Sequence, residues 1–94
     1  RALISSPASG TVLFSDRFKR LGHIIIIHHG GGYISTLRGF EKTFVSAGQS
    51  LLQNDPVGLL PSQNVGESSN GAMLYYELRY NGQVINPLTI MSGS

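Results

Sequence analysis

Residues 23–37 have the sequence HIIIIHHGGGYISTL, and the four consecutive isoleucines near its start decide the fold class. A strand that contains Ile24–Ile27 has no polar position there, so both of its faces should be buried, as in the central strand of a sheet. Each isoleucine that becomes fully buried contributes about 1.5–3 kcal/mol to stability. The sequence therefore predicts that the hydrophobic core is centred on this strand.

The three glycines that follow, Gly30–Gly32, are interpreted as a tight turn. They do not form a phosphate-binding loop, because no Lys-Ser/Thr pair follows them and no helix begins there. A metal site is also disfavoured. His28 and His29 point to opposite faces of a strand, and His23 would lie about 20 Å from His29 along an extended strand.

Turn residues recur along the rest of the chain at a spacing of about ten residues, which is typical of all-β proteins. We predict strands near residues 2–5, 10–18, 23–29, 33–37, 50–52, 57–60, 73–80 and 83–85. No segment has sustained helical periodicity, although residues 40–44 could form one helical turn. The polar segment 61–71 is predicted to be a flexible loop. The predicted fold class is a compact antiparallel β-sheet or sandwich.

The composition of the 94 residues restricts the possible functions. A chain of this length forms one small domain, so residues 1–94 are taken as a single unit. A net charge of +2 without a Lys/Arg-rich tract gives no indication of nucleic-acid binding. The absence of cysteine excludes disulfides and thiolate metal sites. No apolar run approaches the roughly 20 residues that span a bilayer.

The segment 72–80, AMLYYELRY, alternates between apolar and polar residues, as a half-buried strand does. Its predicted core face carries Leu74, Tyr76 and Leu78, and its other face carries Met73, Tyr75, Glu77 and Arg79. The second face has two possible interpretations. It is either a solvated surface, on which a Glu/Arg pair contributes at most about 1 kcal/mol, or the floor of a groove whose tyrosine and arginine are residue types enriched at binding hot spots.

Four segments, in this order and spacing, resemble the LytM or lysostaphin-type zinc endopeptidase domain. They are SPASGTVLFSDRFKRLGHIIIIHHGGGYIS (6–35), FVSAGQSL (44–51), DPVGLL (55–60) and LYYELRYNGQVINP (74–87). The resemblance extends from residue 4 to about residue 90 and is greatest to the degenerate EnvC-type murein hydrolase activators of Gram-negative bacteria. It implies an all-β fold of the LytM (duplicated hybrid motif) type, with antiparallel sheets and a groove across one of them.

Active members of that family bind zinc through an upstream His-x-x-x-Asp, a downstream His-x-His and the histidine of a Tyr-x-His-Leu segment. The resemblance places the His-x-His positions on Met73 and Tyr75, and the third histidine on Gly39. The upstream motif would precede Ala2, so we expect the N-terminal part of the family domain to lie before residue 1. Because no matching position is a histidine, the resemblance implies a degenerate homologue without zinc, cofactor or catalytic residues, and therefore not an enzyme.

The resemblance to the activators also implies a partner, a periplasmic N-acetylmuramoyl-L-alanine amidase. The domain would engage a regulatory helix that blocks the zinc site of the amidase, and so regulate peptidoglycan hydrolysis during cell division. The groove residues predicted to bind this partner are Met73, Tyr75, Glu77, Arg79, Tyr33 and Leu37.

Three alternatives remain at this point. The domain could be a non-catalytic peptidoglycan-binding module, in which Tyr75 and Tyr33 stack on sugar or line the site. It could be an enzyme completed by an upstream segment, which the residues at positions 73 and 75 disfavour. It could also be a structural domain whose partner is another part of its own chain.

Overall fold

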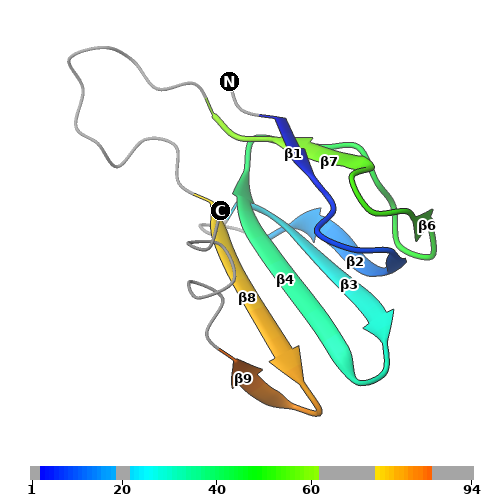
Figure 1. The fold of residues 1–94 in the computed structure, drawn as a ribbon. Coiled ribbons are helices and arrows are strands. Elements are labelled where there is room, and N and C mark those ends of the chain that lie inside the picture. The colour runs from blue at the N-terminus through cyan, green and yellow to red at the C-terminus, as the bar shows by residue number, and fades with distance from the viewer. Residues whose placement is uncertain (1–2, 19–21, 62–73, 86–94) are drawn as a thin grey trace.

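The computed structural model describes residues 3–18, 22–61 and 74–85, and this part of the chain consists of strands and turns without a helix (Figure 1). The strands are β1 (Leu3–Ser5), β2 (Gly10–Arg17), β3 (His23–Gly30), β4 (Tyr33–Phe40), β5 (Lys42–Thr43), β6 (Ser50–Leu51), β7 (Pro56–Leu59), β8 (Tyr75–Tyr80) and β9 (Gln83–Ile85). The predicted all-β fold is confirmed. No helix within the described ranges is long and apolar enough to cross a membrane.

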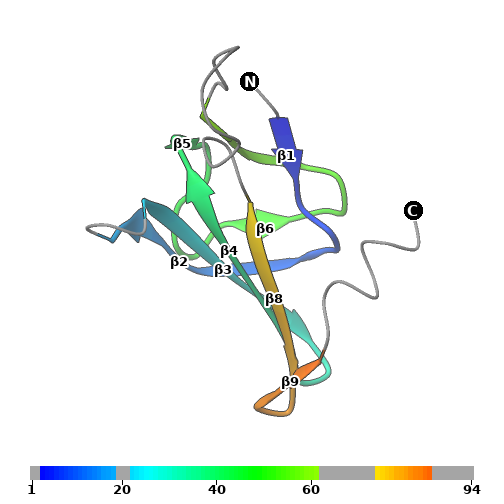
Figure 2. The ribbon, with the colours of Figure 1, turned by 90° about the vertical axis from the view of Figure 1, so that its left-hand side faces the viewer.

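The strands form two antiparallel sheets. The larger sheet has the order β6-β2-β3-β4-β8-β9, and the smaller one has the order β1-β7-β5. The smaller sheet lies across one face of the larger sheet, as the two perpendicular views show (Figures 1 and 2). We call the face that it covers the inner face of the six-stranded sheet, and the opposite face the outer face. Since β3 lies between β2 and β4, it is an interior strand, as its isoleucines predict.

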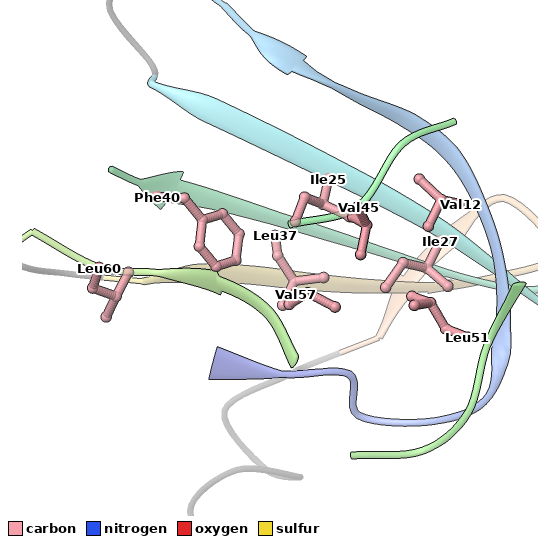
Figure 3. Close-up of a cluster of buried hydrophobic side chains, with 9 residues drawn as sticks. All are labelled: Val12, Ile25, Ile27, Leu37, Phe40, Val45, Leu51, Val57 and Leu60. Atoms are coloured by element: carbon pink, nitrogen blue, oxygen red, sulfur yellow. The ribbon is translucent and has the colours of Figure 1, made fainter. Parts of the chain in front are cut away.

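The core lies between the inner face and the smaller sheet (Figure 3). Ile25 and Ile27 are completely buried there, against Val57 of β7. The rest of the buried cluster consists of Val12, Leu37, Phe40, Val45, Leu51 and Leu60. Ile24 and Ile26 point to the outer face, where the first is buried and the second is only partly covered. The predicted core centre is therefore confirmed for one face of β3, and the outer face is covered less completely than predicted.

Two tight turns align the ends of β4 and β8. The first is the glycine turn between β3 and β4, and the second, at Asn81-Gly82, has positive φ angles of 51° and 85°. The backbone N–H of Asn81 donates a hydrogen bond of 2.9 Å to the carbonyl oxygen of Gly32. A Cβ atom at Gly32 would overlap the side-chain oxygen of Asn81. Glycine is therefore needed at position 32, because it lets the two turns approach each other.

The structure differs from the sequence-based prediction at residues 40–44. These residues do not form a helical turn, because β4 continues to Phe40 and Lys42–Thr43 pairs with β7 in the smaller sheet. A bulge at Gly39, with a φ of +105°, carries the chain from one sheet to the other. Of the predicted loop at 61–71, all but Pro61 lies outside the described residues.

Candidate functional site

Strand β8 presents alternate side chains to the two faces of the larger sheet. Tyr75 has 43% of its surface exposed on the outer face, whereas Leu78 on the inner face has 9%. Tyr76 is partly buried and packs against the core. The predicted alternation of this strand is thus confirmed for the residues described. Met73 lies outside the described part of the chain.

Tyr33 and Leu37 are not on the same face as Tyr75. In the ladder between β4 and β8, Leu37 lies opposite Tyr76, and Tyr33 lies opposite Tyr80. Residues directly opposite each other on neighbouring strands share a face, so Tyr33 and Leu37 belong to the inner face. Leu37 is a buried core residue, and Tyr33 stacks on Tyr80 with 4.7 Å between the ring centroids. The prediction that they share one groove with Tyr75 is wrong, and a partner-binding role for any of these residues stays a prediction.

On the outer face, Tyr75, Glu77 and Arg79 form a chain of polar contacts. The hydroxyl of Tyr75 donates a hydrogen bond of 3.0 Å to Oε1 of Glu77. Nε of Arg79 donates to Oε2 of the same carboxylate at 2.6 Å. The bond from Arg79, followed by that from Tyr75, holds the pKa of Glu77 below its ordinary value of 4.5, although partial burial acts in the opposite direction. One ionised carboxylate therefore positions both side chains.

Arg38 joins this chain of contacts from the neighbouring strand β4. It lies directly opposite Tyr75, and its guanidinium carbon is 4.2 Å from the centroid of the tyrosine ring. A planar guanidinium at this distance is attracted by the π-system of the ring. We call Arg38, Tyr75, Glu77 and Arg79 the outer cluster. Sequence reasoning missed Arg38, since its contact with Tyr75 depends on the register of two strands that are far apart in the chain.

An apolar depression lies on the same face, on strands β2 and β3. It has a volume of about 220 Å³ and is lined by Phe14, Phe18, Ile24 and Ile26. The ladders place it beside the outer cluster, because Ile24 pairs with Arg38 across the β3–β4 boundary. The outer face thus combines an apolar depression with charged side chains. The sequence predicted Tyr75, Glu77 and Arg79 on this face but not the depression.

The inner face carries larger clefts. One of about 410 Å³ is lined by Leu3, Ile4, Ser5, Pro7, Leu37, Leu74 and Tyr76. A second, of about 300 Å³, shares Pro7 and Tyr76 with it and is lined also by Ala8, His29, Gly30, Tyr33 and Leu78. Apart from His29, Tyr33 and Tyr76, the lining of the two clefts carries no titratable side chain.

His29 holds the β1–β2 connection against the larger sheet. Its Nδ1 donates to the carbonyl oxygen of Ser9 at 2.8 Å, since a carbonyl can only accept. In the neutral ring, Nε2 then accepts from the hydroxyl of Ser35 at 2.7 Å. The oxygen of Ser35 lies 3.2 Å from the hydroxyl of Tyr76. Because both ring nitrogens are engaged, His29 has a structural role in this arrangement.

The described residues do not fit a hydrolytic zinc site. Such a site needs three protein ligands that converge on one point. Within residues 3–18, 22–61 and 74–85, no group of three or more His, Cys, Asp or Glu side chains lies close enough to hold a metal ion. Both nitrogens of His29 are already hydrogen-bonded. We therefore assign no reaction step to a metal.

Comparison with known proteins identifies similar domains. The model of peptidase family M23 matches residues 1–87. The chain is 33% identical over 89 residues to the NlpD/LppB homologue of Buchnera aphidicola and 27% identical over 84 residues to the murein hydrolase activator EnvC of Escherichia coli. These matches cover 94% and 89% of this chain, but only 26% and 19% of the two relatives. Other relatives are named as peptidases.

A similar solved structure is a chain of the SpoIIIAH–SpoIIQ complex. It superposes with a TM-score of 0.80 and 26% identity, over 95% of this chain and 62% of that one. Lysostaphin, at 14% identity and a TM-score of 0.79, shares the fold.

Proposed function

The chain belongs to peptidase family M23. Within this family, we propose that it is a non-catalytic LytM-type domain that binds and activates an N-acetylmuramoyl-L-alanine amidase of the cell wall. In this role it would regulate peptidoglycan hydrolysis during cell division, in the periplasm. The relative named as a murein hydrolase activator supports this assignment, whereas the relatives named as peptidases make catalysis the alternative to exclude.

One observation carries the proposal. The outer face presents Tyr75, whose ring contacts Arg38 and whose hydroxyl is bonded to Glu77, at a position where the resemblance implies a zinc ligand in active relatives. These contacts position the tyrosine and leave its ring partly exposed. Tyrosine and arginine in such a setting are typical of protein-binding hot spots. The surface is therefore suited to hold a partner, and its described residues offer no group of three metal-binding side chains.

The shape and polarity of the outer face suit an amphipathic helix. Helices dock through apolar side chains that recur every three or four residues, and Phe14, Phe18 and Ile26 provide an apolar surface for them. An activator shifts its target only if it binds the active state more tightly than the inhibited one. We propose that the domain binds the regulatory helix of the amidase after that helix has left the amidase zinc site.

The test combines the domain with the amidases of its own organism and measures the release of dye from labelled murein. We expect little release by the domain alone, slow release by the amidase alone and faster release by the mixture. Release by the domain alone would contradict its non-catalytic assignment. If no amidase is stimulated but the domain sediments with insoluble murein, it is a peptidoglycan-binding module instead.

A further inference from the structure

The outer cluster contains two guanidinium groups and one carboxylate, so within the described residues Arg38 has no acidic side chain in direct contact and feels Glu77 only through its longer-range charge. Glu77 provides the single negative charge of the cluster, and its carboxylate forms an ion pair with Arg79 at 2.6 Å. The guanidinium of Arg38 packs on the ring of Tyr75 and makes no ion pair with any other described residue. Asp16, the nearest acidic residue along its row of the sheet, is two strands away across Ile24 and accepts a hydrogen bond from the backbone of Arg17.

We propose that Arg38 binds a carboxylate on the partner segment that occupies the outer face. This inference rests on the proposed function, since it names the chemistry that the same surface recognises. Arginine has five N–H donors in one plane, and stacking on a ring leaves these in-plane donors available. A carboxylate can accept two of them at once. Arg79 is less suited to this role, because its Nε already donates to Glu77.

The position of Arg38 determines where the carboxylate must be on the partner. Arg38 lies between Ile24, its neighbour on β3, and Tyr75, its neighbour on β8. Neighbouring strands are about 4.8 Å apart. On a helix, side chains three or four residues apart are separated by a similar distance, about 5–6 Å. A helix with an apolar residue over the depression can therefore place an Asp or Glu, one turn away, over Arg38.

Partial burial of Arg38 strengthens its hydrogen bonds to a partner carboxylate. Arg38 is only partly accessible to solvent, and its guanidinium carbon lies over the ring of Tyr75, 4.2 Å from the centroid. Charge-assisted hydrogen bonds are stronger where water is partly excluded. An acidic partner residue is consequently favoured over a neutral one, and a basic residue at the same place would be repelled by the guanidinium of Arg38.

The test measures the affinity of the domain for the amidase that the dye-release assay identifies, by titration calorimetry at low and high salt. Arg38→Ala should weaken binding tenfold or more, which corresponds to about 1.4 kcal/mol, and should reduce the salt dependence. Arg38→Lys should restore only part of the affinity, because lysine lacks the planar fork. Lys42→Ala removes one positive charge from the smaller sheet and should bind as the parent does. Melting curves establish that each variant is folded.

A second variant separates this inference from the proposed function. Phe18→Ser changes the exposed apolar depression without touching the outer cluster. If it weakens binding while Arg38→Ala binds like Lys42→Ala, the role of Arg38 is wrong and the proposed function stands. If neither variant changes affinity, the outer face is not the amidase site. If Arg38→Ala loses binding to murein sacculi but not to the amidase, the carboxylate belongs to peptidoglycan, and the assignment to a protein partner is overturned.

Discussion

Arg38 lies opposite Tyr75 in the β4–β8 ladder, and its guanidinium carbon is 4.2 Å from the centre of the tyrosine ring. The hydroxyl of the same ring is hydrogen-bonded to Glu77. Tyr75 is therefore restrained through both its ring and its hydroxyl group. A restrained aromatic side chain loses little conformational entropy when a partner binds. Tyr75 is therefore a preorganised anchor on an exposed surface.

Replacement of this anchor should impair activation without unfolding the domain. We expect Tyr75→Ala to reduce amidase activation tenfold or more in the dye-release assay, because the variant loses apolar contact area and also the support of Arg38. Tyr80→Ala is a matched control. Tyr80 is on the same strand and is 42% exposed, against 43% for Tyr75, but it belongs to the inner face. Equal effects of the two variants would contradict a specific role of the outer face.

The ion pair between Glu77 and Arg79 should depend on pH in a defined way. The pKa of Glu77 is lower in the folded protein than its ordinary value of 4.5, chiefly because Arg79 donates a hydrogen bond to it. A depressed pKa stabilises the fold at pH values above the unfolded-state pKa, and this stabilisation is lost as the pH falls through the folded-state value. The parent should therefore melt slightly above Glu77→Gln at neutral pH, and the difference should disappear only below about pH 4.5. A difference that disappears already near pH 6 would assign the effect to another group.

The two faces of β3 should differ in their tolerance of truncation. Ile27 is fully buried in the core, so Ile27→Ala should cost about 2–5 kcal/mol of unfolding free energy. This is a large part of the total stability of a small domain. Ile26 lies on the outer face and is only partly covered, so Ile26→Ala should cost less. Urea denaturation of both variants measures the difference, and an equal or reversed order would show that the register of β3 is wrong.

Zinc should not bind stoichiometrically to the domain. The resemblance to LytM-type domains implies that Tyr75 and Gly39 stand at positions of family histidines, and the described residues offer no cluster of three metal-binding side chains. After equilibration with zinc at neutral pH, elemental analysis should detect well under one ion per chain. A tightly bound zinc ion, or hydrolysis of murein by the purified domain, would contradict the non-catalytic assignment.

Local patterns in the sequence predicted the strands and the orientation of β8 because those features repeat within a few residues. Leu74, Tyr76 and Leu78 alternate with polar residues, and Asn81-Gly82 forms the hairpin turn between the two predicted strands 73–80 and 83–85. Strand β4 carries no such pattern. Its two faces, Tyr33-Ser35-Leu37 and Ile34-Thr36-Arg38, each mix apolar and polar residues, so alternation alone cannot distinguish them. Their assignment depends on pairing with β3 and β8, which is set by contacts distant in sequence. This dependence explains both the incorrect grouping of Tyr33 with Tyr75 and the omission of Arg38.

The bulge at Gly39 has a consequence for what this position tolerates. With a φ of +105°, it lies where residues with a side chain are strained by about 1–3 kcal/mol. The resemblance to active LytM-type domains would call for a histidine there, and a Gly39→His substitution would lower stability by about that amount unless the bulge rearranged. Building a metal ligand at position 39 would therefore require a change in the main chain as well as a new side chain.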